Sequence, residues 1–152
     1  MIGIDVGGAN LKLVDGKRVT LRYCPIWEDA PLAEHLQAFR DAHPDPDAAV
    51  VMSGELADCF GSKMEGIGFI VDAVREVFPG ARFYGTDAAF HQDAVPQLAA
   101  ANWLASADLL RTRYPGAVLL DVGSTTTDII PLAEFPRLLG LSDLGRLQRG
   151  YL

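Results

Sequence analysis

The chain has 152 residues, which suits one ordinary domain, and its 49% hydrophobic and 22% charged residues are typical of a folded globular protein. Its formal charge of −7 argues against nucleic acid or an anionic membrane as a partner, because both attract basic surfaces. Two cysteines are too few for a disulfide framework, and the three histidines lack zinc-ligand spacing. The opening MIGIDVGG has no signal-peptide features, so we expect a cytoplasmic protein.

The first part of the chain predicts an antiparallel meander of three strands. Its opening segment is short, apolar and rich in β-branched residues, and it runs directly into Gly7-Gly8. Asp15-Gly16 is typical of a hairpin turn between the second and third strands. The expected strands cover residues 2–6, about 10–14 and 18–24.

From Pro31 onward, helical and strand patterns alternate. Ser62 and Glu65 form a capping box that begins the second of three helices. This order predicts an α/β fold with a mixed sheet covered by helices, and RTRYPG at 111–116 is the expected boundary. Helices are expected from Pro31 to His43, from Ser62 to Pro79 and at about 94–110, and strands at 48–54, 81–87, 117–123 and 129–132.

An internal repeat joins two segments that lie 116 residues apart. IDVGGANLKLV at 4–14 aligns without gaps with LDVGSTTTDII at 120–130. The shared Asp-Val-Gly core places Asp5 opposite Asp121 in this alignment. The offset is too long for a solenoid period and about the size of a domain, so it predicts two duplicated lobes.

Each copy of the repeat has the chemistry of a phosphate-binding turn. A carboxylate ends a buried strand, and the small residues that follow let a ligand approach backbone N–H groups. Hydroxyl groups add donors, and carboxylates can hold Mg²⁺ against phosphate oxygens, which would reconcile an acidic chain with an anionic ligand. A single such turn is often only a hairpin, whereas two in register favour function. The predicted Mg²⁺ ligands are Asp5 and Asp121, and the predicted phosphate-binding residues are Gly7, Gly8, Lys12, Gly123, Ser124, Thr125, Thr126 and Thr127.

The loop after the expected strand at 48–54 supplies further candidates. Ligands of open α/β sheets lie beyond the carboxyl ends of the strands, so Ser53, Glu55, Asp58 and Lys63 are expected in the cleft, with Lys63 near phosphate. The alternative is that Glu55 and Asp58 are simply solvated. Glu55, Asp58 and Asp128 are all candidates for a general base, and the sequence does not choose between them.

The two hairpins resemble the phosphate-1 and phosphate-2 motifs of the actin-like ATPase superfamily. Members of that superfamily have two ribonuclease-H-like lobes with the phosphate ligand in the cleft between them. The resemblance implies an N-terminal ribonuclease-H-like lobe at 1–112, followed at 113–152 by the first hairpin of an incomplete second lobe. It also leaves ATP open as a cofactor beside Mg²⁺.

A closer resemblance covers nearly the whole chain. Five blocks in order, IGIDVGGANLK, SGELADCFGSKMEG, YGTDAAF, AANWLASA and LDVGSTTTDIIPL, are similar to the hydantoinase-related family of tetrahydromethanopterin-linked C1-transfer pathway proteins, which includes the archaeal methanofuran-biosynthesis synthase. The resemblance adds Asn10 to the first phosphate element and Asp128 to the second. That family continues past the position of Leu152, so a C-terminal lobe or a second chain is expected to complete the cleft, with a homo-oligomer as an alternative.

The family implies a transferase that condenses γ-glutamyltyramine with an aminomethylfuran-methyl diphosphate. In the mechanism we expect, an amine attacks the methylene carbon while the phosphate loops and Mg²⁺ stabilise the leaving diphosphate. Asp5, Asp121, Asp128, Glu55 and Asp58 are the expected catalytic carboxylates. Two alternatives remain: an ATP-dependent kinase or ATPase of the same superfamily, and a non-catalytic binding or assembly module.

Overall fold

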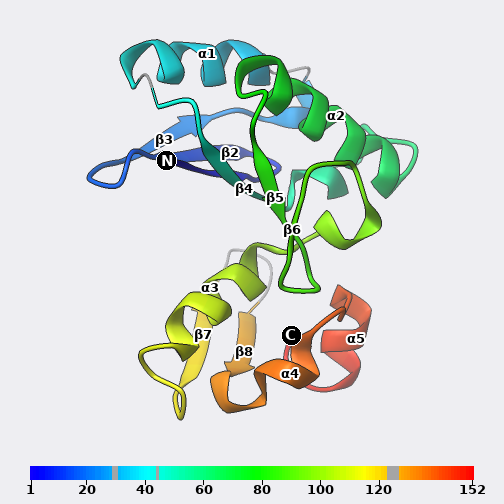
Figure 1. Cartoon of the computed structure of the whole chain (residues 1–152). Coiled ribbons are helices and arrows are strands. Elements are labelled where there is room, and N and C mark those ends of the chain that lie inside the picture. Colours follow the sequence, from blue (N-terminus) through cyan, green and yellow to red (C-terminus); the bar gives the residue numbers. More distant parts are fainter. Residues whose placement is uncertain (29–30, 44, 123–126) are drawn as a thin grey trace.

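The computed structural model describes residues 1–28, 31–43, 45–122 and 127–152, and Figure 1 shows their arrangement. A six-stranded mixed sheet forms the larger part, in the order β3-β2-β1-β4-β5-β6. β1 pairs with β2 antiparallel and with β4 parallel, so the predicted meander and the return to a parallel strand are confirmed. The strands are β1 (Ile2–Val6), β2 (Asn10–Val14), β3 (Val19–Tyr23), β4 (Ala48–Met52), β5 (Arg82–Tyr84) and β6 (Phe90–His91).

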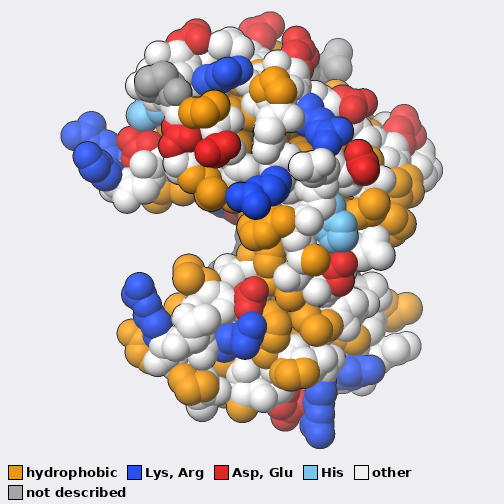
Figure 2. All heavy atoms as spheres, viewed as in Figure 1, with side chains coloured by type: hydrophobic (Ala, Val, Ile, Leu, Met, Phe, Trp, Pro, Cys, Tyr) orange, Lys and Arg blue, Asp and Glu red, His pale blue; other side chains and the backbone are white. Residues whose placement is uncertain are grey.

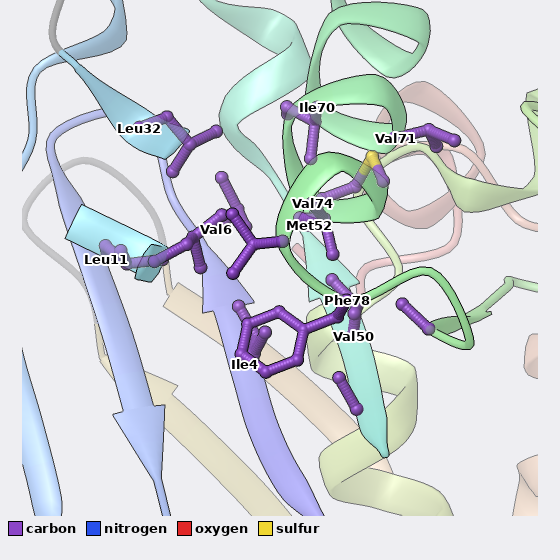
Figure 3. Close-up of a cluster of buried hydrophobic side chains, with 14 of the residues drawn as sticks. Ile4, Val6, Leu11, Leu32, Val50, Met52, Ile70, Val71, Val74 and Phe78 are labelled. Atoms are coloured by element: carbon purple, nitrogen blue, oxygen red, sulfur yellow. The ribbon is translucent and has the colours of Figure 1, made fainter. Parts of the chain in front are cut away.

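Two helices, α1 (Leu32–Ala42) and α2 (Lys63–Val77), cover one face of this sheet. The capping box is confirmed at α2, where Ser62 Oγ accepts a hydrogen bond of 3.2 Å from the Glu65 N–H. Alternate residues of β1 and β4 point into the core, because side chains of a strand alternate between its two faces. Figure 3 shows these strand residues packed against α2. The labelled residues include Ile4, Val6, Val50, Met52, Ile70 and Val74, all buried.

A second group of elements lies on the other side of the sheet (Figure 1). It comprises α3 (Asn102–Arg111), β7 (Val118–Val122), β8 (Thr127–Pro131), α4 (Phe135–Leu138) and α5 (Asp143–Gln148). β7 and β8 form a separate two-stranded sheet. The core of this group joins Trp103 and Leu104 of α3 to Ile130, Phe135 and Leu138. Although α3 precedes the boundary predicted near residue 112, it therefore shares its core with elements that follow it.

The two hairpins of the repeat have the same register. Asp5 lies opposite Lys12 in the first hairpin, and Asp121 lies opposite Asp128 in the second. Both pairs keep the 116-residue offset found in the sequence, so the repeat is a structural one.

The third helix is shorter than predicted. The sequence indicated a helix from about residue 94, but α3 begins only at Asn102. Val95 is extended because it precedes Pro96, the residues from Pro96 to Leu98 form a single 3₁₀ turn (η3), and Ala100 has a positive φ of 47°. The strand expected at 81–87 is likewise cut to Arg82–Tyr84, where the chain turns into the unpredicted strand β6. Within the described ranges, no helix combines the length and apolarity that crossing a membrane requires.

Candidate functional site

The first predicted phosphate turn opens into a cavity of about 890 Å³, which we call the loop cavity. β1 and β4 are parallel neighbours, so the segments that follow them emerge at the same edge of the sheet. The cavity accordingly combines the turn after β1 with the loop after β4. The predicted residues that line it are Gly7, Gly8, Asn10, Lys12, Ser53 and Asp58.

Small residues allow these two segments to approach each other. The Gly7 N–H donates to the Asn10 carbonyl at 3.0 Å, which closes the turn, and the Ser53 N–H donates to the Val6 carbonyl at 3.0 Å. A Cβ atom at Gly54 would lie 2.6 Å from Ile26 Cδ1 and 3.0 Å from the Gly7 carbonyl oxygen, so only glycine fits there. In the described part of the chain, the Gly8 and Ala9 N–H groups have no hydrogen-bond acceptor and are free for an anion.

A second cavity of about 820 Å³ lies between the sheet and α3, and we call it the cleft cavity. Figure 2 shows the hollow that separates the two parts of the molecule. Asp5 and Asp121 both line this cavity, although they come from different sheets. Lys12 lines both cavities and connects them. The two carboxylates predicted to hold Mg²⁺ thus line one cavity.

The two carboxylate oxygens of Asp5 differ in their hydrogen bonding. Its Oδ2 accepts a hydrogen bond of 2.7 Å from Lys12 Nζ, across the hairpin. Its Oδ1 is buried without a hydrogen-bond partner among the described residues. An unpaired buried carboxylate oxygen is costly, and a cation would satisfy it. Mg²⁺ takes one or two carboxylates together with phosphate oxygens, so the donor type of Asp5 and Asp121 suits that ion. The described residues hold no cluster of three or more His, Cys, Asp or Glu that could bind a metal by itself.

Glu55 is sequestered from both cavities. Its side chain is 1% exposed, and Oε1 accepts a hydrogen bond of 2.8 Å from the Ala100 N–H. Burial raises the pKa of this carboxyl above its usual range, and the hydrogen bond from Ala100 opposes the rise only in part. Glu55 therefore ties the short 3₁₀ turn η2 (Gly54–Leu56) to the segment that leads into α3.

Asp128 is also turned away from both cavities. It forms a buried ion pair with Arg146, whose guanidinium also contacts Asp143 at 3.0 Å and lies 4.4 Å from the centre of the Trp103 ring. Burial raises the pKa of Asp128, and the charge of Arg146 opposes that rise. The arrangement fixes α5 against β8 and α3.

The remaining predicted residues lie at element ends. Lys63 begins α2 and Thr127 begins β8, and both are exposed and line neither cavity. Gly123, Ser124, Thr125 and Thr126 lie outside the described residues.

The cavities also contain side chains that the sequence analysis missed. Trp27 lines the loop cavity, and the Tyr84 hydroxyl donates to Asp108 at 2.7 Å in the cleft cavity. Trp27 could have been noticed in the sequence, because it lies between two prolines, just after an expected strand and outside any helical pattern. Tyr84 and Asp108 are joined only by tertiary structure, so no local signal could have paired them.

No protein-family model matches the chain. It is 33% identical over 165 residues to the (4-{4-[2-(γ-L-glutamylamino)ethyl]phenoxymethyl}furan-2-yl)methanamine synthase of Methanocaldococcus jannaschii. That alignment covers 100% of this chain and 49% of the synthase. The chain therefore spans about half the length of this curated relative, and the similarity includes both hairpins.

Proposed function

We propose that this chain belongs to a transferase of methanofuran biosynthesis, which joins γ-glutamyltyramine to a furanylmethyl diphosphate and releases diphosphate. The observation that carries the proposal is the similarity of the whole chain, both hairpins included, to a synthase of a furan methanamine. The actin-like architecture, with two ribonuclease-H-like lobes facing a phosphate ligand, is part of the same proposal. It is supported by the repeated hairpin register and by the cavity that Asp5 and Asp121 share.

The name of the relative identifies the bond that is made. A phenoxymethyl group on furan is an aryl ether, and the named product keeps its methanamine and γ-glutamylamino nitrogens. The nucleophile we propose is therefore the phenol oxygen of the amine substrate, in place of the amine nitrogen expected from the sequence. Its attack forms the bond to the methylene carbon and breaks the bond from that carbon to diphosphate. Diphosphate leaves with the electron pair, and the phenol proton passes to a base.

The loop cavity is the proposed site of the diphosphate. Gly8, Ala9 and Lys12 line it, and in this proposal the N–H groups of Gly8 and Ala9 and the ammonium group of Lys12 contact the phosphate oxygens. Asp5 and Asp121 line the cleft cavity, which shares Lys12 with the loop cavity, and Mg²⁺ held there, on the side of the diphosphate that faces the cleft, would stabilise the negative charge that develops on the leaving group. The acceptor then enters from the cleft cavity, which Lys12 connects to the loop cavity.

We assign the role of general base to Asp58. Three carboxylates were candidates, and of these Asp58 alone lines one of the two cavities. Glu55 is committed to the Ala100 N–H, and Asp128 to Arg146. A positioned base contributes about 10²–10⁴-fold to a rate, so the Asp58→Asn variant is expected to lose about that factor in kcat.

The test is to incubate the chain with γ-glutamyltyramine, a furanylmethyl diphosphate and Mg²⁺. The aryl ether is measured by mass spectrometry and the released diphosphate by an enzyme-coupled assay. Asp72→Asn is the matched control, because Asp72 is an exposed residue of α2 and its substitution removes the same charge as Asp58→Asn. This variant should keep full activity. Ether formation that is unaffected by Asp58→Asn would refute the assignment of the base. ADP production from ATP would instead favour a kinase or ATPase.

A further inference from the structure

The loop cavity has an aromatic wall that the phosphate chemistry does not use. Trp27, in the short 3₁₀ turn η1 (Ile26–Glu28), lines the cavity with 46% of its surface exposed. Its Cζ3 atom lies 3.9 Å from the position that a Cβ at Gly8 would occupy, which places the indole directly beside the phosphate turn. Leu56, 40% exposed, lines the same cavity. An anion site and an exposed apolar wall thus share one cavity.

The backbone that carries the indole is held in place, while 46% of the Trp27 surface stays exposed. Next to it, Ile26 is 5% exposed and donates its N–H to the Gly8 carbonyl at 2.9 Å. The Ile26 carbonyl in turn accepts a long contact of 3.8 Å from the Cys59 thiol, and Gly54 packs against the Ile26 side chain. The turn that carries Trp27 is therefore fixed to both segments that form the loop cavity. A pre-positioned aromatic ring loses little conformational freedom when a ligand stacks on it.

We propose that Trp27 is the stacking platform for the aromatic ring of the diphosphate donor. The inference rests on the proposed function, which places the diphosphate at the Gly7-Gly8 turn. The ligand class it names is a furan, or a similar flat ring, joined to a diphosphate through a single methylene group. The indole lies close enough to the turn for a single methylene group to join a ring stacked on it to a diphosphate at the turn. In ATP a ribose and the whole phosphate chain separate the base from the terminal phosphate, so the base would pass beyond Trp27.

Stacking should appear as a preference for aromatic diphosphates. Aromatic pairs contribute about 0.5–1.5 kcal/mol beyond the area they bury, which corresponds to about 2–13-fold in affinity. We therefore expect furfuryl diphosphate to bind up to about tenfold more tightly than inorganic diphosphate in the presence of Mg²⁺. Trp27→Ala should remove that preference and leave the affinity for inorganic diphosphate unchanged, and Trp27→Phe should retain most of it. The furan should also quench the indole emission.

The experiment is a calorimetric titration of the full chain with four probes: inorganic diphosphate, furfuryl diphosphate, isopentyl diphosphate and ATP. Isopentyl diphosphate separates aromatic stacking from general apolar contact. Tyr114→Ala is the matched control, because Tyr114 is 59% exposed and lines neither cavity. Circular dichroism checks that each variant is folded.

The outcomes separate the two proposals. A furfuryl preference that survives in Trp27→Ala, or that isopentyl diphosphate equals, overturns the stacking role while leaving the diphosphate site intact. If the wild-type chain binds no diphosphate with Mg²⁺, the proposed function itself is refuted and the stacking role falls with it. ATP that binds more tightly than furfuryl diphosphate, and depends on Trp27, would assign the platform to adenine and also refute the inference.

Discussion

Arg146 contacts two carboxylates and an indole ring while it is 5% exposed. Three elements therefore depend on one guanidinium group, because Asp128 belongs to β8, Asp143 to α5 and Trp103 to α3. Arginine suits this position because its planar group can bind carboxylates on its edge and an aromatic ring on its face. The contact also explains why Asp128, equivalent in the repeat to the exposed Lys12, is withdrawn from the cavities.

The first prediction concerns this ion pair. Arg146→Met leaves the Asp128 carboxylate buried without its partner, which should cost about 3–5 kcal/mol of the free energy of unfolding. Burial raises the pKa of Asp128 in the folded state, so the folded protein holds this proton more tightly than the unfolded chain does. The stability that this protonation contributes is therefore present at low pH and is lost as the pH rises through the folded-state pKa. Without Arg146 that pKa rises further, and the variant should be more strongly destabilised at pH 7.5 than at pH 5.

Urea unfolding at the two pH values measures this difference. Arg137→Met is the control, since the Arg137 side chain is 75% exposed and, among the residues that the structure describes, forms an ion pair with Glu134 of the preceding turn alone. That substitution should change stability by less than about 1 kcal/mol. Equal effects of the two substitutions would contradict a structural role for the buried pair.

At the level of elements, α2 carries two glycines that differ only in their surroundings. A Cβ added at Gly66 would lie 2.6 Å from the Glu55 carbonyl oxygen and 2.8 Å from Glu55 Cα, whereas a Cβ at Gly68 would meet nothing within 4 Å. Gly66 therefore sets the close approach of α2 to η2, the turn that precedes Asp58. Gly68 has no such constraint and only weakens the helix.

The second prediction is that alanine has opposite effects at these two positions. Gly68→Ala should raise the free energy of unfolding by about 0.5–1 kcal/mol, through helix propensity alone. Gly66→Ala should lower it by about 1–3 kcal/mol, because the clash is with backbone atoms that cannot rotate away. Thermal unfolding followed by circular dichroism measures both changes, and each variant is the control for the other. Stabilisation by both substitutions would show that η2 can move away from α2 at little cost.

The elements that sequence predicted well are those defined by local pattern. The strand at 2–6, the capped helix α2 and both hairpins follow from apolar periodicity and turn residues that lie next to one another. The predicted start of α3 was wrong, because the sequence Ala99-Ala100-Ala101 favours a helix locally. Two features outweigh this local preference for a helix. The residue before Pro96 is extended, and Ala100, whose N–H donates to Glu55, has a positive φ.

For the candidate site too, sequence could predict only what a local motif contains. Gly7, Gly8 and Lys12 were found because the motif itself contains them. The burial of Glu55 and Asp128 depends on partners 45 and 18 residues away, which no spacing in the sequence reveals. Sequence therefore named the candidate carboxylates and could not say which of them line a cavity.

On the scale of the whole molecule, Asp5 and Asp121 stand on two separate sheets and line one cavity. The buried residues form two hydrophobic clusters, and the second joins Tyr84 of the main sheet to α3 and β8, so the distance between the two carboxylates depends on how these clusters pack. The hydrogen bond from Tyr84 to Asp108 connects β5 to α3, and the one from Ala100 to Glu55 connects the segment before α3 to η2. A ligand that needs both carboxylates should therefore stabilise the molecule as a unit.

The third prediction tests that coupling through Mg²⁺. Magnesium diphosphate at 100 times its Kd should stabilise the wild-type chain by about 2.7 kcal/mol. At about 2–4 °C per kcal/mol, Tm should rise by about 5–10 °C. Asp5→Asn and Asp121→Asn should each remove most of this rise, and Asp72→Asn should not. Without Mg²⁺, Asp5→Asn should bind diphosphate at least as well as wild type, because Lys12 loses its carboxylate partner. Weaker metal-free binding in Asp5→Asn would contradict a metal role for Asp5 and indicate that the Asp5–Lys12 pair shapes the turn itself.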